Sequence, residues 1–166
     1  MEPILTVTHL QKYYGARSSV TRAIDDLSFS VQPGEFVGIM GASGSGKTTL
    51  LNCIATIDRP TAGHIIVDGA DITAMKNKAL SKFRRERLGF VFQDCNLLDT
   101  LTAFENIALA LTILKTPAKE IEPRVKETAR LLEIEACLSR YPYQLSGGQR
   151  QRVAAARAII SRPALV

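Results

Sequence analysis

The sequence offers little that would cross-link the chain or carry it through a membrane. Its three cysteines, Cys53, Cys95 and Cys137, are an odd number with no close pair, which indicates neither a disulfide framework nor a CxxC metal site. The longest apolar stretch, residues 108–114, is interrupted by Thr112 and falls far short of the ~20 residues of a membrane-spanning helix. No basic-then-apolar leader opens the chain. We therefore expect a chain of the reducing cytosol that neither spans a membrane nor is exported.

Composition and charge are those of a globular domain. With 166 residues, 46% of them hydrophobic and 22% charged, the chain can form one core with room for an inserted subdomain, and disorder or a collagen-like structure is excluded. Lysine and arginine outnumber aspartate and glutamate by 21 to 16. This surplus suits nucleic acid, an anionic membrane face or a phosphate ligand, and charge alone does not select among them.

The first half of the chain has the pattern of strands around one helix. Strands are predicted over residues 4–10, 23–31, 36–40, 64–67 and 88–92. The first two alternate and are expected to pair antiparallel, whereas 36–40 is apolar without interruption, which is typical of a strand buried on both faces. A glycine loop then leads into a helix predicted over 47–57.

From residue 100 onward the pattern becomes helical. Thr102-x-x-Glu105 has the spacing of a capping box and predicts the start of a helix. A second helix is predicted with Pro123 in its first turn and its end near Ile134. The last helix is predicted from near Ser146 to about Ser161, and residues 164–166 resemble the opening of another buried strand. Without a repeat or flexible linker, the helical part is expected to be an insertion.

Residues 41–48 contain a complete phosphate-loop motif. The segment Gly41-Ala42-Ser43-Gly44-Ser45-Gly46-Lys47-Thr48 matches G-x-x-x-x-G-K-[ST], between a predicted strand and a predicted helix. Its glycines allow successive N–H groups to face one anion, and the helix start adds a positive end. Lys47 is expected to reach the β- and γ-phosphates, Thr48 to offer a hydroxyl to Mg²⁺, and Thr49 to bond near the α-phosphate. A flexible Gly/Ser loop is the plainer alternative, but the motif in this context favours a nucleoside triphosphate site.

A second candidate anion site opens the last predicted helix. The segment reads Leu145-Ser146-Gly147-Gly148-Gln149. Ser146 and Gln149 have capping-box spacing, so an ordinary N-cap is one interpretation. Two glycines would lower helix stability if packing were their only purpose, whereas they allow a phosphate to approach exposed N–H groups closely. The pair therefore favours an anion site.

With these two motifs in this order, the chain resembles the ATP-binding cassette family, whose signature LSGGQ lies downstream of a phosphate loop. The resemblance implies an α/β fold. It consists of a P-loop NTPase core of the RecA-like type, an N-terminal antiparallel β subdomain and an inserted α-helical subdomain. The implied division is 1–93 for the antiparallel β and P-loop core, 94–148 for the helical signature subdomain, and 149–166 for the return to the core.

The resemblance also assigns roles outside the two motifs. Gln93 matches the family's glutamine loop, which implies contact with the γ-phosphate, Mg²⁺ and the attacking water; by itself it is a polar residue at a strand end. Residues 94–104 are implied to contact the transmembrane partner. Tyr14, in Tyr13-Tyr14-Gly15, resembles the family's adenine-stacking aromatic, with Tyr13 as the alternative and a structural tyrosine as the plainer interpretation.

Within the family, residues 57–63 and 92–102 resemble antimicrobial-peptide exporters, those of the bacitracin type first, as well as macrolide exporters and lipoprotein-release ATPases. The implied function is an ATP-binding subunit that couples ATP binding and hydrolysis to export, with ATP and Mg²⁺ as cofactors. The implied partners are a transmembrane permease and a second ATP-binding subunit, whose ATP would be contacted by Ser146, Gly147, Gly148 and Gln149. The implied location is cytoplasmic, on the inner face of the cell membrane through the permease, and no nucleic acid is expected.

Residues that complete catalysis in the family have no counterpart in the sequence. There, a Walker B strand ending in Asp and Glu directly follows the segment that matches residues 162–166, so we expect the C-terminal part of the core to be missing. The general-base Glu and switch His are absent with it, and His9 and His64 lie too early to replace them. We therefore expect the 166 residues alone to bind nucleotide weakly, without turnover, and to be prone to aggregation.

Two other functions stay open on the sequence alone. The same ATPase head serves in nucleic-acid maintenance or translation, for which Lys82, Arg84, Arg85 and Arg87 are a candidate basic patch. Glu86 lies within this segment, which favours a solvated helix face instead. The other alternative is a catalytically dead ATP-binding or dimerising module.

Overall fold

The computed structural model describes residues 2–15 and 19–166, which form two compact units. The first unit contains the described residues up to Arg84, together with Leu165. The second contains residues 85–164 and Val166.

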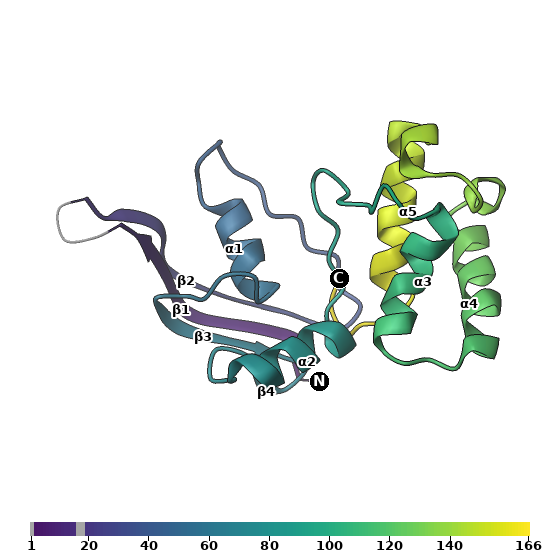
Figure 1. The fold of residues 1–166 in the computed structure, drawn as a ribbon. Coiled ribbons are helices and arrows are strands. Elements are labelled where there is room, and N and C mark those ends of the chain that lie inside the picture. Colours follow the sequence, from purple (N-terminus) through teal and green to yellow (C-terminus); the bar gives the residue numbers. More distant parts are fainter. Residues whose placement is uncertain (1, 16–18) are drawn as a thin grey trace. The chain divides into compact units, whose positions relative to one another are not determined.

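The first unit is organised around a four-stranded antiparallel sheet (Figure 1). The strands are β1 (Leu5–Tyr14), β2 (Thr21–Val31), β3 (Ala62–Val67) and β4 (Ala70–Asp71), in the order β2-β1-β3-β4. Leu5 of β1 lies opposite Val31 on one side and Val67 on the other. Leu5, Val7 and Leu10 are buried with Val67. The structure thus confirms the strands predicted over 4–10, 23–31 and 64–67 and the antiparallel pairing of the first two.

Helix α1 (Lys47–Ile54) follows the glycine loop and packs beside the sheet, where it contacts β2 (Figure 1). The predicted end at Ile57 is wrong by one turn. Thr56 adopts φ 60°, and the N–H groups of Ile57 and Asp58 both bond to the carbonyl of Asn52, which closes the helix early. Helix α2 (Asn77–Arg87) comes next and buries Leu80.

Three further strand predictions are wrong. Residues 36–40, 88–92 and 164–166 form no strand, and Phe36 and Met40 are 98% and 93% exposed. A strand exists only when a neighbour pairs with its backbone, and among the described residues the sheet comprises only β2, β1, β3 and β4. Leu88 and Leu165 are isolated bridge residues, and residues 36–40 have no strand pairing, so these apolar runs predicted strands that the structure does not contain.

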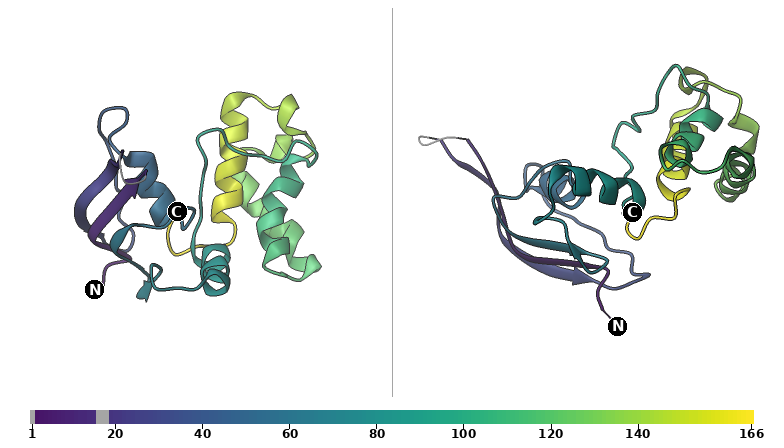
Figure 2. Two further views of the ribbon diagram at one scale, coloured as in Figure 1. Left: turned by 60° about the vertical axis from the view of Figure 1, so that its left-hand side comes forward. Right: turned by 60° about the horizontal axis from the view of Figure 1, so that its bottom comes forward.

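The second unit is a cluster of helices, with α3 (Ala103–Ile113), α4 (Ala118–Leu131) and α5 (Gly147–Ile159) side by side (Figures 1 and 2). Two short 3₁₀ turns, η1 (Glu135–Cys137) and η2 (Pro142–Gln144), connect α4 to α5. Their shared core comprises Ile107, Leu111, Val125, Ala129, Val153 and Ala156, all fully buried. The capping box predicted at Thr102 and Glu105 is confirmed, because each residue's side chain bonds to the other's backbone N–H.

The prediction for the second helix needs correction. Pro123 lies inside α4, beyond its first turn, because Pro117 is the N-cap and the helix begins at Ala118. Proline lacks the N–H that an interior position normally donates, so local preference disfavours this placement. Val125 and Ala129 are fully buried on the face that meets the other helices, and this packing outweighs the lost bond.

Candidate functional site

The phosphate loop is exposed from Gly41 to Ser45 and ends at the start of α1. The ammonium of Lys47 donates to the carbonyls of Gly41 and Ala42 at 2.9 and 2.6 Å. The loop therefore curls around its own lysine, and a positive charge lies inside that curve. A phosphate that enters the curve meets this charge and can replace the carbonyls as its partner.

Gly46 is required by both packing and backbone conformation. It adopts φ 87° at the N-cap of α1, and a Cβ there would lie 2.2 Å from the carbonyl oxygen of Ala23. Its own carbonyl accepts the first helical bond, from Leu50, at 2.8 Å. No side chain caps this helix and its first turn has no acidic residue, so its leading N–H groups are available to an anion.

The hydroxyl groups that follow the lysine have different surroundings. Thr48 is exposed, which suits a hydroxyl that completes the coordination of Mg²⁺ around a bound nucleotide. Thr49 is half-buried and lies close enough to the Tyr14 hydroxyl to lower the pKa of Tyr14. Among the described residues, no group of three His, Cys, Asp or Glu side chains could hold a metal by itself. Magnesium would therefore depend on nucleotide oxygens and water in addition to Thr48.

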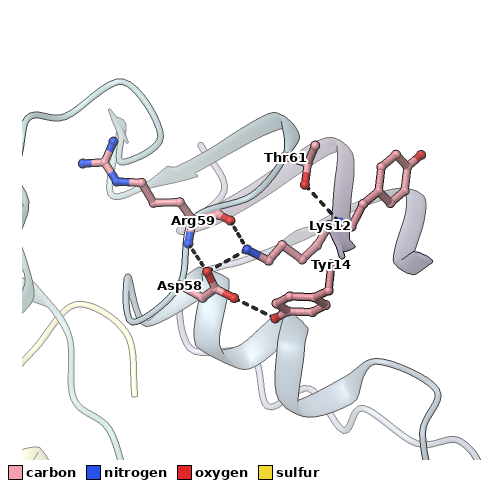
Figure 3. Close-up of polar contacts among 6 residues, drawn as sticks. Lys12, Tyr14, Asp58, Arg59 and Thr61 are labelled. Atoms are coloured by element: carbon pink, nitrogen blue, oxygen red, sulfur yellow. Dashed lines mark hydrogen bonds and ion pairs between the residues drawn. The ribbon is translucent and has the colours of Figure 1, made fainter. Parts of the chain in front are cut away.

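Tyr14, the predicted base-stacking residue, belongs to a polar cluster with Lys12 and Asp58 (Figure 3). The Tyr14 hydroxyl donates to Asp58 at 2.6 Å, and the Lys12 ammonium lies 4.7 Å from the centre of the Tyr14 ring. The Asp58 hydrogen bond, followed by burial, raises the pKa of Tyr14, while the nearby Thr49 hydroxyl opposes the rise.

Tyr13, the alternative, is held elsewhere. Its hydroxyl donates to Asp25 of β2 at 2.9 Å, and Arg22 lies over its ring at 5.6 Å. Neighbouring residues of a strand point to opposite faces, so the two tyrosines cannot serve the same ligand surface. Of the two tyrosine hydroxyls, that of Tyr14 donates to Asp58, in the segment that follows α1, and that of Tyr13 donates to Asp25 of β2.

The signature segment lies in the second unit, at the N-terminus of α5. Ser146 is the N-cap, its Oγ accepts from Gln149 N at 3.2 Å, and Gln149 Oε1 accepts from Ser146 N at 2.9 Å, as the predicted capping box requires. Gly147 and Gly148 are exposed. A Cβ at Gly148 would meet nothing within 4 Å, and one at Gly147 only the tip of Arg150. Packing against the residues that the structure describes therefore does not explain either glycine.

Gln93 is exposed in the second unit, before the segment predicted to contact a transmembrane partner. Two residues hold that segment in place, Asn106 and Arg157, and neither was assigned a role from the sequence. The fully buried Asn106 accepts from Leu98 N at 2.8 Å and donates to the carbonyl of Leu98 at 3.1 Å. Arg157 donates to the carbonyls of Cys95 and Asn96 at 2.9 and 2.8 Å. An asparagine within the apolar stripe of α3 was the one sequence signal for this role.

A cavity of about 250 Å³ lies in the first unit beside Asp58 and Arg59, and is also lined by Cys53, Thr61 and Thr73. Neither Tyr14 nor the phosphate loop lines it. The candidate nucleotide residues thus form an exposed surface around the loop and α1, separate from this cavity.

The comparisons with known proteins identify the class. The family model described as "ABC transporter" matches residues 24–166, and the chain therefore belongs to the ABC transporter family. A structure of the ATP-binding cassette MJ0796, described as a dimeric post-hydrolysis state bound to ADP and Pi, superposes with a TM-score of 0.87 at 38% identity. The match covers 96% of this chain and 70% of that one. The α/β fold of a P-loop ATPase cassette is thereby confirmed.

Two similar proteins narrow the resemblance to ATP-binding subunits. The chain is 51% identical over 165 residues to the uncharacterised ABC transporter ATP-binding protein YvcR of Bacillus subtilis. It is 46% identical over 163 residues to the bacitracin export ATP-binding protein BceA of Halalkalibacterium halodurans. Each alignment covers 98% of this chain, which spans 64% of the length of either relative. The predicted family is confirmed, and the nucleic-acid alternative is not favoured. Within the described residues, no helix is both long and apolar enough to cross a bilayer.

Proposed function

We propose that this chain is the nucleotide-binding part of an ABC transporter subunit that couples ATP binding and hydrolysis to export. The observation that carries the proposal is the phosphate loop, whose lysine is held in its curve beside an uncapped helix N-terminus. The name of the BceA relative supports export and a peptide antibiotic as cargo.

The signature segment is the second half of the proposed ATP site. Gly147 and Gly148 are exposed at a helix N-terminus, and no described residue lies close enough to exclude a Cβ at either position. A ligand that must approach the backbone closely does need them. ATP bound at one subunit's loop and contacted by the partner's Ser146, Gly147, Gly148 and Gln149 meets this requirement, and the MJ0796 cassette is described as a dimer.

The residues of the chain divide the work on the phosphates. Lys47 moves from the loop carbonyls to the β- and γ-phosphates, where its charge stabilises the transition state. The loop residues 41–46 offer their N–H groups, and Thr48 would hold Mg²⁺, which would neutralise phosphate charge when bound. Gln93 orients the attacking water. Tyr14 stacks on the base, as its resemblance to the family's aromatic implies.

Partners and location follow from the family. We place a transmembrane permease against residues 94–104, which would hold the chain at the inner face of the cell membrane. No nucleic acid partner is expected. For residues 1–166 by themselves we propose nucleotide binding without turnover, because the resemblance places the general-base glutamate after the segment that matches residues 162–166.

The test is calorimetric titration of ATP with Mg²⁺ into the protein as its gene encodes it. Lys47→Ala removes a charged hydrogen-bond donor to phosphate and is expected to weaken binding by about tenfold or more and to abolish export in cells. Lys119→Ala, on the exposed face of α4, is the matched control and is expected to change neither. Equal affinity and export in the Lys47 variant would remove the phosphate-loop assignment.

A further inference from the structure

The carboxylate of Asp58 accepts hydrogen bonds from three donors in two separate parts of the first unit (Figure 3). Oδ1 accepts from Lys12 Nζ at 2.7 Å and from the backbone N–H of Arg59 at 2.7 Å, while Oδ2 accepts from the Tyr14 hydroxyl at 2.6 Å. The Lys12 and Asp58 side chains are 11% and 30% exposed, so water competes poorly for this pair. The carboxylate is therefore a fixed acceptor for the tyrosine.

Lys12 limits how the ring of Tyr14 can be used. Its ammonium also donates to the carbonyl of Arg59 at 2.7 Å, and from that position it lies over the Tyr14 ring. One face of the ring is thereby occupied by a cation, while the residue as a whole stays 42% exposed. A stacking ligand has only the opposite face available.

The same contacts tie the ring to the helix that begins at the phosphate loop. Thr49, two residues after Lys47, lies close enough to the Tyr14 hydroxyl to lower the pKa of Tyr14. At the other end of α1, the N–H of Asp58 bonds to the carbonyl of Asn52 at 3.1 Å. The position of the ring is thus set relative to both ends of the phosphate-binding helix.

We propose that Asp58, together with Lys12, is a positioning residue. It holds the Tyr14 ring in the orientation that stacks on the base of a bound nucleotide, and it fixes the position of the ring relative to α1. The proposal rests on the proposed function, because it concerns the same nucleotide. Asp58 does not touch the ligand. Its role is to keep the hydroxyl end of Tyr14 in place. Because the ring is already ordered, binding of the base does not carry the entropy cost of immobilising it.

The experiment separates base recognition from phosphate recognition. Calorimetry measures the Kd of ATP and of inorganic tripolyphosphate, both with Mg²⁺, for the protein as its gene encodes it and for Asp58→Asn and Tyr14→Phe. The ratio of the two Kd values reports what the base and sugar contribute. We expect this advantage to fall at least about fivefold in both variants, and tripolyphosphate affinity to change by less than about twofold.

Asp25→Asn is the matched control, because Asp25 accepts from Tyr13 as Asp58 does from Tyr14. It is expected to leave the ratio unchanged. Tyr14→Phe keeps the ring and the Lys12–Asp58 pair, so it decides the outcome if Asp58→Asn lowers stability.

An unchanged ratio in Tyr14→Phe overturns the proposal, as does an equal loss of both affinities in Asp58→Asn with an unchanged ratio. Failure of the unmodified protein to bind either ligand overturns the proposed function itself and is distinguishable from both results.

Discussion

The buried side chain of Asn106 bonds to both backbone groups of Leu98, eight residues earlier in the chain. A third bond, to the carbonyl of Leu101 at 3.0 Å, extends the contact along the loop. One amide therefore provides the backbone partners that this irregular segment lacks in a helix or sheet. The segment proposed to face the permease is held in shape by α3.

Asn106→Leu should destabilise the loop that contains Leu98 and Leu101. It leaves the N–H of Leu98 and the carbonyl of Leu101 without the fully buried Asn106 amide as their partner, while the carbonyl of Leu98 keeps its bond from the N–H of Leu101, and the expected cost is about 2 kcal/mol. Urea denaturation measures the loss, and hydrogen exchange at the Leu98 amide should become faster. Lys119→Ala serves as the neutral control. Slow exchange at Leu98 in the Asn106 variant would contradict this account.

Gly46→Ala and Gly34→Ala should separate steric clash from backbone strain. Both glycines have positive φ, 87° and 78°, but a Cβ meets Ala23 O at 2.2 Å at the first and nothing within 4 Å at the second. Gly34→Ala should cost about 1 kcal/mol and leave ATP affinity intact. Gly46→Ala should cost clearly more and also weaken ATP binding, because α1 must shift away from β2. Equal losses of stability in the two variants would argue against the clash.

Gly148→Ala should stabilise the fold and impair function. The new methyl meets no atom within 4 Å, and alanine is a better helix former than glycine by up to about 1 kcal/mol. In the proposed ATP site, the same methyl would obstruct the close approach of a phosphate bound at the partner subunit. Thermal unfolding and ATP-dependent dimerisation, followed by light scattering, are the two measurements. Gln151→Ala, on the exposed face of α5, should leave dimerisation unchanged. Normal dimerisation in the Gly148 variant would count against the signature site.

The stability contributed by Asp58 should depend on acid in a predictable direction. Hydrogen bonds from Lys12 first and Tyr14 second hold the pKa of Asp58 below its ordinary value of 3.8. The folded protein therefore binds this proton less readily than the unfolded chain. The contribution is fully present above 3.8 and is lost as the pH falls through the lower value of the folded state.

Urea denaturation of the unmodified protein and of Asp58→Asn between about pH 6 and about pH 3 measures this contribution. The difference in unfolding free energy should be constant at the upper end and shrink at the lower end. A difference that grows with acid would show that the carboxylate is not held in its ionised form.

Much of the local structure could be predicted from the sequence. The capping boxes at Thr102 and Ser146 lie where their spacing places them, and the alternation of β1 and β2 gave their antiparallel pairing. These features depend on residues a few positions apart, or on a period of two that any half-buried strand displays. The prediction of a strand over 36–40 was wrong. An apolar run indicates side chains that favour burial, but it does not show that a neighbouring strand is present to pair with the backbone.

The sequence by itself determined the family, the phosphate loop and the signature, since each is a contiguous motif whose chemistry follows from its own residues and spacing. Only the tertiary structure decided that Tyr14 and not Tyr13 bonds to Asp58, 44 residues away, and that Arg157 holds Cys95 from 62 residues away. The physical reason is that a side chain's partner across such a separation is selected by how strands and helices pack. The type of a side chain determines whether it can donate or accept a hydrogen bond, and the fold determines which partner it contacts.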